Sequence, residues 1–237
     1  ERSHTAVLDA AMERVRADLS SRGDVRALVA AHAFITGSGP AVVSESERDL
    51  RVGGIGERQC AQLAGALEQG LDDALFCLPG THSKWALVEG GQVRNFSTVM
   101  TGELFNLISR QSILRLSVPE DGDAEADPEI FDAAVQQALE PGFALTSVLF
   151  SIRAEGLLAS NTKINPAARL SGLLIGAEIA AIRNDLTRYG KAYLIGTGKL
   201  TRLYARAIVQ AGGEPVLLDG GLLVRRGLLA SALSLFD

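Results

Sequence analysis

Cysteine, histidine and tryptophan are scarce in this sequence: its 237 residues include 2 Cys, 3 His and 1 Trp. Cys60 and Cys77 are too far apart to form a CxxC pair, and no histidines cluster beside them. A zinc site is therefore not expected, and the sequence predicts no metal ligand. Two buried free thiols in a reducing cytosol are the expected state, which favours a cytoplasmic protein.

Long apolar runs and an excess of basic residues are also missing. No run reaches the length of a membrane span, and no apolar stretch follows the charged start Glu1–His4, so neither a membrane helix nor a signal peptide is expected. The net charge is -5 and no basic stripe stands out, which argues against nucleic-acid binding. The composition suits a globular enzyme with a small-molecule ligand, and a homodimer is a reasonable expectation.

The last part of the chain alternates clearly between strands and helices. Apolar runs predict strands at Lys191–Ile195 and Glu214–Leu218. Helical periodicity predicts helices at Leu200–Ala211 and Leu222–Phe236. This alternation is typical of an α/β fold.

Three further strands are predicted near the middle of the chain. Gly90 and Gly91 separate the last two of them, which is a hairpin signal. The three strands are Ala74–Leu78, Ala86–Val88 and Gln92–Phe96, and before them the pattern predicts helices at 5–20 and Glu57–Leu67 and a strand at Val25–Ala31.

The stretch between these two groups of strands is mainly helical in pattern. Thr101 is a plausible N-cap for a helix over Glu103–Leu114. An acidic loop that contains proline and glycine follows at residues 117–128. Two more helices are predicted, at about 129–139 and 142–154.

One long helix is predicted from about Ala167 to Tyr189. Gly172 and Gly176 lie four residues apart on it, a spacing that lets another backbone approach closely. We interpret this pair as a mark of tight packing inside the protein.

A polar turn, Pro79–Trp85, follows the first of the middle strands. Its Gly80, Thr81, His82, Ser83 and Lys84 offer backbone N–H groups, two hydroxyls and a cation, which suit a phosphate. An ordinary β-turn with a solvated lysine fits the same residues. The histidine can either bind a phosphate or brace the turn.

A second candidate site is the turn Gly196-Thr197-Gly198, with Asp219 at the end of the next strand. This nearly matches a dinucleotide fingerprint, but Thr201 replaces the third glycine. The same strand–glycine–helix unit can instead hold an adenosine or a phosphate at the helix N-terminus, or be a plain βα turn.

Glu103 is a third candidate. Its carboxylate can bind a sugar hydroxyl or accept a proton. At the start of a helix it also stabilises the helix dipole without any further role, and both interpretations stay open on the residues alone.

Together these stretches resemble one family, 2-keto-3-deoxygalactonate kinase (2-dehydro-3-deoxygalactonokinase). The resemblance covers about Gly56 to the C-terminus. It is carried by Leu78-Pro79-Gly80-Thr81-His82-Ser83-Lys84-Trp85, Phe96-Ser97-Thr98-Val99-Met100-Thr101-Gly102-Glu103-Leu104-Phe105, Leu149-Phe150-Ser151-Ile152-Arg153, Leu170-Ser171-Gly172-Leu173-Leu174-Ile175-Gly176-Ala177-Glu178 and Tyr193-Leu194-Ile195-Gly196.

The resemblance implies an actin-like (ribonuclease-H-like) ATPase fold with two lobes and a cleft, here residues 1–70 and 71–237. It also implies ATP- and Mg2+-dependent phosphoryl transfer to the 6-hydroxyl of a 2-keto-3-deoxy sugar acid. The second phosphate loop would contain Gly80, Thr81, His82, Ser83 and Lys84, and the adenosine would be flanked by Gly196, Thr197 and Gly198. Lys84 and Glu103, the latter near the cleft, are then the candidate catalytic residues.

The family opens with a hairpin of the form Asp-Trp-Gly-Thr-Ser-x-x-Arg, and no stretch of these 237 residues matches it. The first phosphate loop and the catalytic base are therefore unassigned. Two alternatives follow: a relative that binds nucleotide or sugar acid without catalysis, and an oxidoreductase built on the Gly196–Asp219 unit. Arg153 and Lys163 are candidates for the substrate carboxylate, although solvated surface cations fit them equally well.

Overall fold

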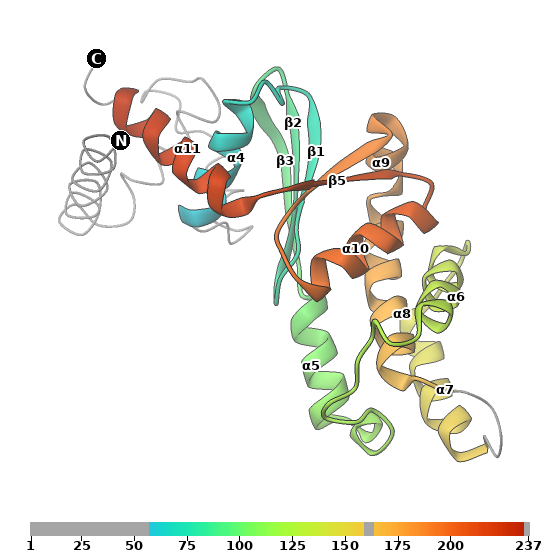
Figure 1. The fold of residues 1–237 in the computed structure, drawn as a ribbon. Helices are drawn as coiled ribbons and strands as arrows, with labels where there is room; N and C mark the ends of the chain where they lie inside the picture. The colour runs from blue at the N-terminus through green and yellow to red at the C-terminus, as the bar shows by residue number, and fades with distance from the viewer. Residues whose placement is uncertain (1–56, 159–163, 235–237) are drawn as a thin grey trace. The chain divides into compact units, whose positions relative to one another are not determined.

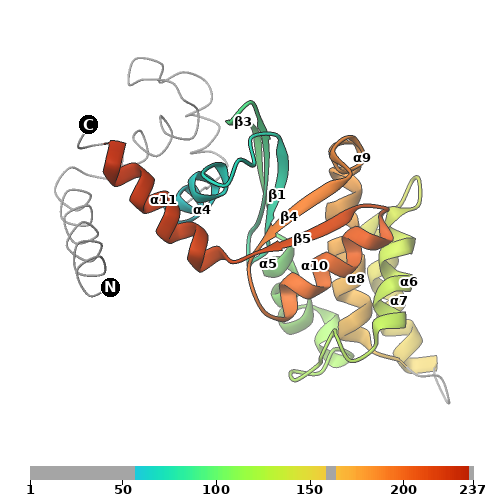
Figure 2. The same cartoon turned by 45° about the horizontal axis from the view of Figure 1, so that its top comes forward.

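The computed structural model describes residues 57–158 and 164–234, and in them the chain forms an α/β fold with one five-stranded sheet. The strand order is β3-β2-β1-β4-β5 (Figures 1 and 2). Short turns join the first three strands, and a helix joins β4 to β5, so the sheet is mixed. The strands are β1 (Ala74–Leu78), β2 (Ser83–Glu89), β3 (Gln92–Val99), β4 (Lys191–Ile195) and β5 (Glu214–Leu218).

Helices make up most of the remaining described residues. None of those in 57–158 and 164–234 combines the length and the apolar character that a membrane crossing requires. They are α4 (Glu57–Leu67), α5 (Thr101–Gln111), the 3-10 helix η1 (Ile113–Leu116), α6 (Pro128–Leu139), α7 (Leu145–Leu158), α8 (Pro166–Ala181), α9 (Arg183–Tyr189), α10 (Lys199–Gln210) and α11 (Gly220–Ser234).

The described residues form two compact units. The first contains the residues up to Phe76, then Trp85–Thr98, and those from Leu218 onward. The second contains Cys77–Lys84 and Val99–Leu217. The lobes expected at 1–70 and 71–237 stay a prediction.

The first unit contains the predicted hairpin between β2 and β3. Gly90 and Gly91 have φ values of 59° and 70°, which fit the two central positions of a type I′ turn. In the same unit α4 packs closely on α11: a Cβ added at Gly65 would lie 2.0 Å from the carbonyl oxygen of Leu223. The two helices therefore approach each other at a glycine.

The second unit is built around α8, which is buried along nearly its whole length. Gly172 and Gly176 face α6, as their spacing predicted (Figure 1). A Cβ at Gly172 would lie 2.5 Å from the carbonyl oxygen of Phe131. The glycines thus let the α8 backbone contact α6 directly, and the cluster around this core contains Leu114, Val118, Ala134, Ile152, Ala167, Leu170, Leu173 and Leu174.

We expect Gly172→Ala to destabilise the protein by about 2 kcal/mol, because the added methyl group overlaps the α6 backbone. Alanine in place of glycine favours a helix by about 1 kcal/mol. The sign of the change in the free energy of unfolding therefore shows whether the packing clash outweighs this helix gain. Gly156→Ala on α7 is the matched control, since its Cβ would meet only Ser117 Oγ at 3.7 Å. Urea unfolding midpoints measure both changes, and a rise for Gly172→Ala would contradict the close approach.

The predicted long helix over Ala167–Tyr189 is wrong. It is two helices, α8 and α9, which separate at Ile182 with φ -105° and ψ 12°. Hydrophobic periodicity does not distinguish a one-residue break from a continuous helix. Smaller shifts occur elsewhere: α7 runs over Leu145–Leu158, and α5 ends at Gln111 before η1, while the predicted helix at 5–20 and strand at Val25–Ala31 lie outside the described residues.

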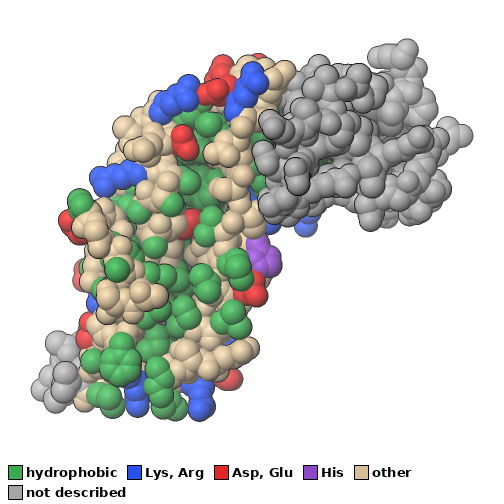
Figure 3. Space-filling view, turned by 180° about the vertical axis from the view of Figure 1, so that it is seen from behind, with side chains coloured by type: hydrophobic (Ala, Val, Ile, Leu, Met, Phe, Trp, Pro, Cys, Tyr) green, Lys and Arg blue, Asp and Glu red, His purple; other side chains and the backbone are tan. Residues whose placement is uncertain are grey.

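Large apolar side chains are exposed on η1 and α7 in the second unit. Ile113, Leu116, Phe150 and Leu157 are each more than half exposed. Figure 3 shows hydrophobic side chains over the middle and lower part of one face of the described surface.

Candidate functional site

The polar turn is shorter than the sequence predicts, because β2 begins at Ser83. Ser83 is 0% exposed and Lys84 is 7% exposed, so neither belongs to a solvated turn. Lys84 Nζ donates to the carbonyl oxygen of His82 at 3.1 Å, and burial lowers the pKa of this lysine. The alternative of an ordinary turn with a solvated lysine is therefore wrong.

The turn is fastened to the first residues of α5. The backbone N–H of Glu103 donates to the carbonyl oxygen of Thr81 at 2.9 Å. A Cβ at Gly102 would lie 2.6 Å from the carbonyl oxygen of Gly80 and 2.8 Å from the Cα of Thr81. Only glycine at position 102 lets the helix and the turn come this close.

His82 and Glu103 form a hydrogen bond at the surface, with His82 Nε2 2.5 Å from Glu103 Oε2. Their side chains are 47% and 37% exposed. The histidine therefore braces the turn against α5 while remaining open to solvent. Glu103 lies in the first turn of α5, where its charge also meets the positive end of the helix dipole.

Thr101 is not the N-cap that the sequence predicts. It is the first residue of α5, and Met100 occupies the cap position without a side-chain hydrogen bond. The Thr101 hydroxyl donates instead to a buried carboxylate, Glu178 Oε2. The hydroxyl proton is therefore directed at the carboxylate, which is a strong acceptor.

Glu178 is the residue that sequence reasoning missed. It lies on α8 and is 5% exposed. Ser83 Oγ donates to its Oε1 at 2.7 Å, and Tyr204 Oη donates to its Oε2 at 2.6 Å. Burial and the nearby Glu178 charge raise the pKa of Tyr204 well above its usual value. The available signal was a single carboxylate within the apolar stretch from Leu173 to Ala181.

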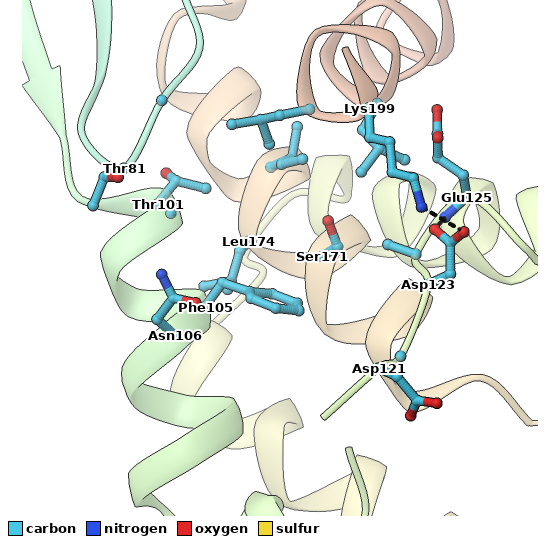
Figure 4. A pocket seen from close by; sticks show the side chains of 17 residues that line it. Thr81, Thr101, Phe105, Asn106, Asp121, Asp123, Glu125, Ser171, Leu174 and Lys199 are labelled. Atoms are coloured by element: carbon cyan, nitrogen blue, oxygen red, sulfur yellow. Dashed lines mark hydrogen bonds and ion pairs between the residues drawn. The ribbon is translucent and has the colours of Figure 1, made fainter. Parts of the chain in front are cut away.

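A pocket of about 350 Å³ lies within the second unit, next to this network. Figure 4 shows Thr81 and Thr101 on one side of it and Lys199 on the other. Phe105 and Leu174 supply apolar surface between them. The remaining lining residues are Gly80, Gly102, Asn106, Asp121, Gly122, Asp123, Ala124, Glu125, Ser171, Ile175, Leu200 and Leu203.

Two helix N-termini open onto the pocket, those of α5 and α10. Thr101 and Gly102 begin the first helix, and Lys199 and Leu200 begin the second. The unpaired N–H groups and the dipole of a helix N-terminus favour an anion. With the adjoining turn, the arrangement can bind a phosphate-bearing ligand that also has an apolar part.

The acidic loop forms one wall of the pocket through ion pairs with α10. Lys199 Nζ lies 2.9 Å from Asp123 Oδ2 (Figure 4). Arg202 contacts both carboxylate oxygens of Glu125, at 2.7 and 2.8 Å. The hydrogen bond with Lys199 lowers the pKa of Asp123 and raises that of the lysine.

Only some of the predicted site residues line the pocket. Gly80 and Thr81 do, whereas His82, Ser83, Lys84 and Glu103 do not. Instead His82 bonds to Glu103, Ser83 to Glu178, and Lys84 to the His82 carbonyl oxygen. Among the later candidates, Gly196, Thr197 and Gly198 precede α10 without lining the pocket.

The other candidates have structural partners or are outside the described part. Asp219 Oδ1 accepts the N–H groups of Gly221 and Leu222, as an N-cap of α11 does. Arg153 Nη1 donates to Ser117 Oγ at 3.3 Å. Lys163 lies outside the described residues.

Comparison with curated proteins finds two kinases. The chain is 38% identical over 188 residues to the probable 2-dehydro-3-deoxygalactonokinase DgoK1 of Rhizobium meliloti (strain 1021), a match that covers 79% of this chain and 61% of the relative. It is 31% identical over 159 residues to the 2-dehydro-3-deoxygalactonokinase of Escherichia coli (strain K12), covering 67% of this chain and 53% of that protein. The chain therefore spans between half and two thirds of the length of these relatives.

A solved structure agrees with these matches. The crystal structure of a putative 2-dehydro-3-deoxygalactonokinase from Sinorhizobium meliloti superposes with a TM-score of 0.67 and is 37% identical, covering 76% of this chain and 60% of that one. Residues 56–231 match the family model described as 2-keto-3-deoxy-galactonokinase. That match spans well over half of the sequence and includes the turn, the pocket and the Glu178 network. The chain belongs to the 2-keto-3-deoxy-galactonokinase family.

Proposed function

We propose that this protein is an ATP-dependent sugar-acid kinase that transfers the γ-phosphoryl group to the 6-hydroxyl of 2-dehydro-3-deoxy-D-galactonate. The observation that carries the proposal is the pocket in which the Gly80–Thr81 turn meets the N-termini of α5 and α10. Family membership supplies the substrate class. It also favours a kinase over the oxidoreductase alternative. That alternative used Asp219 to bind the ribose of a dinucleotide, whereas Asp219 already has a structural role as the N-cap of α11.

The proposed fold is the actin-like ATPase fold with two lobes and a cleft. Its support is the mixed sheet, in which a hairpin and a helix-crossover pair share one set of strands, together with the likeness to the related kinase structure. In such a fold the closing of two lobes excludes water from the transferred phosphoryl group.

The pocket residues fit a nucleotide. The phosphates would lie at Gly80, Thr81 and the start of α5, where backbone N–H groups and a helix dipole favour negative charge. The adenosine would lie toward α10, next to the turn Gly196-Thr197-Gly198, with Leu203 as apolar surface for the base.

Mg2+ would be held mainly through the nucleotide phosphates, because no group of three metal-ligating side chains occurs in the part of the chain that the structure describes. When bound, the ion neutralises charge that develops on the phosphate oxygens.

Lys84 is the proposed cation for the transferred group. Its ammonium has three N–H donors, and the bond to His82 O uses one, so two remain for phosphate oxygens. Glu103 is the proposed contact to the sugar acid. Its carboxylate is partly exposed and oriented by His82, which suits a hydroxyl partner.

The test is ADP release by this chain with ATP, Mg2+ and 2-dehydro-3-deoxygalactonate, alongside calorimetric titration with MgADP. Turnover that depends on the sugar acid is the expected result. Nucleotide binding without turnover in folded protein would favour the binding-only relative, and the same assay on a chain as long as the relatives would then decide whether further residues complete the site. Failure to bind MgADP would overturn the proposal.

A cytoplasmic location remains part of the proposal. Cys60 and Cys77 are both free and buried, as a reducing compartment permits. The homodimer stays a prediction.

A further inference from the structure

Glu178 is a carboxylate in an apolar setting. It is 5% exposed, and on α8 its buried neighbours include Ile175 and Ile179. Burying a carboxylate is costly unless hydrogen bonds compensate for the lost water. Three hydroxyl groups provide that compensation, those of Ser83, Thr101 and Tyr204.

The three hydroxyls come from three different elements of the second unit. Ser83 is the first residue of β2, directly after the turn. Thr101 is the first residue of α5 and lines the pocket. Tyr204 comes from α10 and does not line it. A single carboxylate therefore ties together the elements that surround the pocket.

We propose that Glu178 is a positioning residue that holds the Pro79–His82 turn and the N-terminus of α5 in the geometry that binds the ligand's phosphate. The identity of that ligand as a nucleoside phosphate rests on the proposed function. The inference that Glu178 holds the turn and α5 in place rests only on its hydrogen bonds to Ser83, Thr101 and Tyr204.

The carboxylate acts on the pocket through two short connections. Thr101 is followed by Gly102, which lies against the turn, and then by Glu103, whose N–H donates to Thr81 O. Ser83 directly follows the turn on its other side. If the carboxylate is lost, both anchors of the turn are loosened together.

The negative charge is needed because each hydroxyl has one proton to donate. An ionised carboxylate accepts at both oxygens and can take all three bonds. A glutamine of the same shape presents an NH2 group on one side, which can only donate, so at least one hydroxyl loses its acceptor. Hydrogen bonds to a charged group are also stronger than those between neutral groups.

The test compares Glu178→Gln with Tyr204→Phe. The tyrosine change removes one bond from the same carboxylate and a contact with Ser83, but the bonds of Ser83 and Thr101 to Glu178 remain. It therefore reproduces the structural loss and keeps both anchors of the turn. We expect both variants to lower the melting temperature. Only Glu178→Gln should speed amide hydrogen exchange in residues 79–84 and 99–104, by about tenfold, measured without nucleotide.

Binding provides a second readout. Glu178→Gln should weaken MgADP by about tenfold in calorimetry, with Tyr204→Phe within about twofold of the natural chain. The pair Thr101→Ser and Thr101→Val tests the same link if Glu178→Gln does not fold. Serine keeps the hydroxyl and should preserve slow exchange in residues 79–84, whereas valine should not.

Equal exchange rates in Glu178→Gln and Tyr204→Phe, or equal rates in the serine and valine variants of Thr101, would reduce Glu178 to a part of the core and overturn the proposal. Absence of MgADP binding by the unaltered chain would overturn the kinase function instead. The exchange measurement would still decide the role of Glu178, so the two failures are distinguishable.

Discussion

Lys84→Ala is expected to lower kcat/KM for MgATP by about a thousandfold, because it removes the cation proposed to neutralise the transferred phosphoryl group. The side chain is 7% exposed and already donates to His82 O, so its position is fixed before the ligand arrives. Preorganised charge of this kind acts mainly on the transition state. The loss should therefore appear chiefly in kcat, with a smaller change in MgADP affinity.

Lys84→Met is the matched control, since it keeps most of the apolar stem and loses only the charge. It should be as inactive as Lys84→Ala but closer to the natural chain in thermal stability. Steady-state ADP release and a melting curve measure the two quantities separately. If Lys84→Met retained more than about a tenth of the turnover, the lysine charge would not be responsible for the rate and the proposed role would be wrong.

The strands were the most predictable part of the fold. β1, β4 and β5 have the predicted bounds because each is a short apolar run with turn or polar residues at its ends. The strand predicted for β2 was too short, because Ser83 and Lys84 are polar and polar residues after Gly80 are typical of a turn. Their burial depends on partners outside the strand, Glu178 for the serine and the His82 carbonyl for the lysine.

The contacts of Glu178 could not be predicted because its partners are distant in sequence. Ser83 and Glu178 are 95 positions apart, and Thr101 and Glu178 are 77 apart. Local rules consequently assigned Thr101 to a cap. The acidic loop shows the same limit: its composition indicates exposure, yet Asp123 joins the pocket wall through Lys199, 76 residues later.

The sequence motifs nevertheless singled out segments that meet at one pocket. The turn, the start of α5 and the start of α10 were each singled out, and the structure brings Gly80, Thr101 and Lys199 to one pocket. The motifs do not show which side chains face the cavity and which only hold the lining residues in place. Ser83 and Lys84 were expected to point at the ligand from a turn, and in the structure they belong to the buried strand.

Gly102→Ala is expected to weaken MgADP binding by about a hundredfold, because a small displacement of ligand-binding backbone has effects of that order. The new Cβ would lie 2.6 Å from Gly80 O and 2.8 Å from the Cα of Thr81. Both are backbone atoms, so relief requires the turn to move away from α5, and the hydrogen bond from Glu103 N–H to Thr81 O stretches with it.

Stability and function should separate in this variant. Alanine favours a helix over glycine by about 1 kcal/mol, which offsets part of the strain. Gly156→Ala has the same helix gain without the clash and should bind MgADP as the natural chain does. Calorimetric titration and urea unfolding of the two variants compare them directly. Unchanged affinity in Gly102→Ala would mean that the turn does not hold the phosphates, since its backbone cannot keep its place beside a methyl group at position 102.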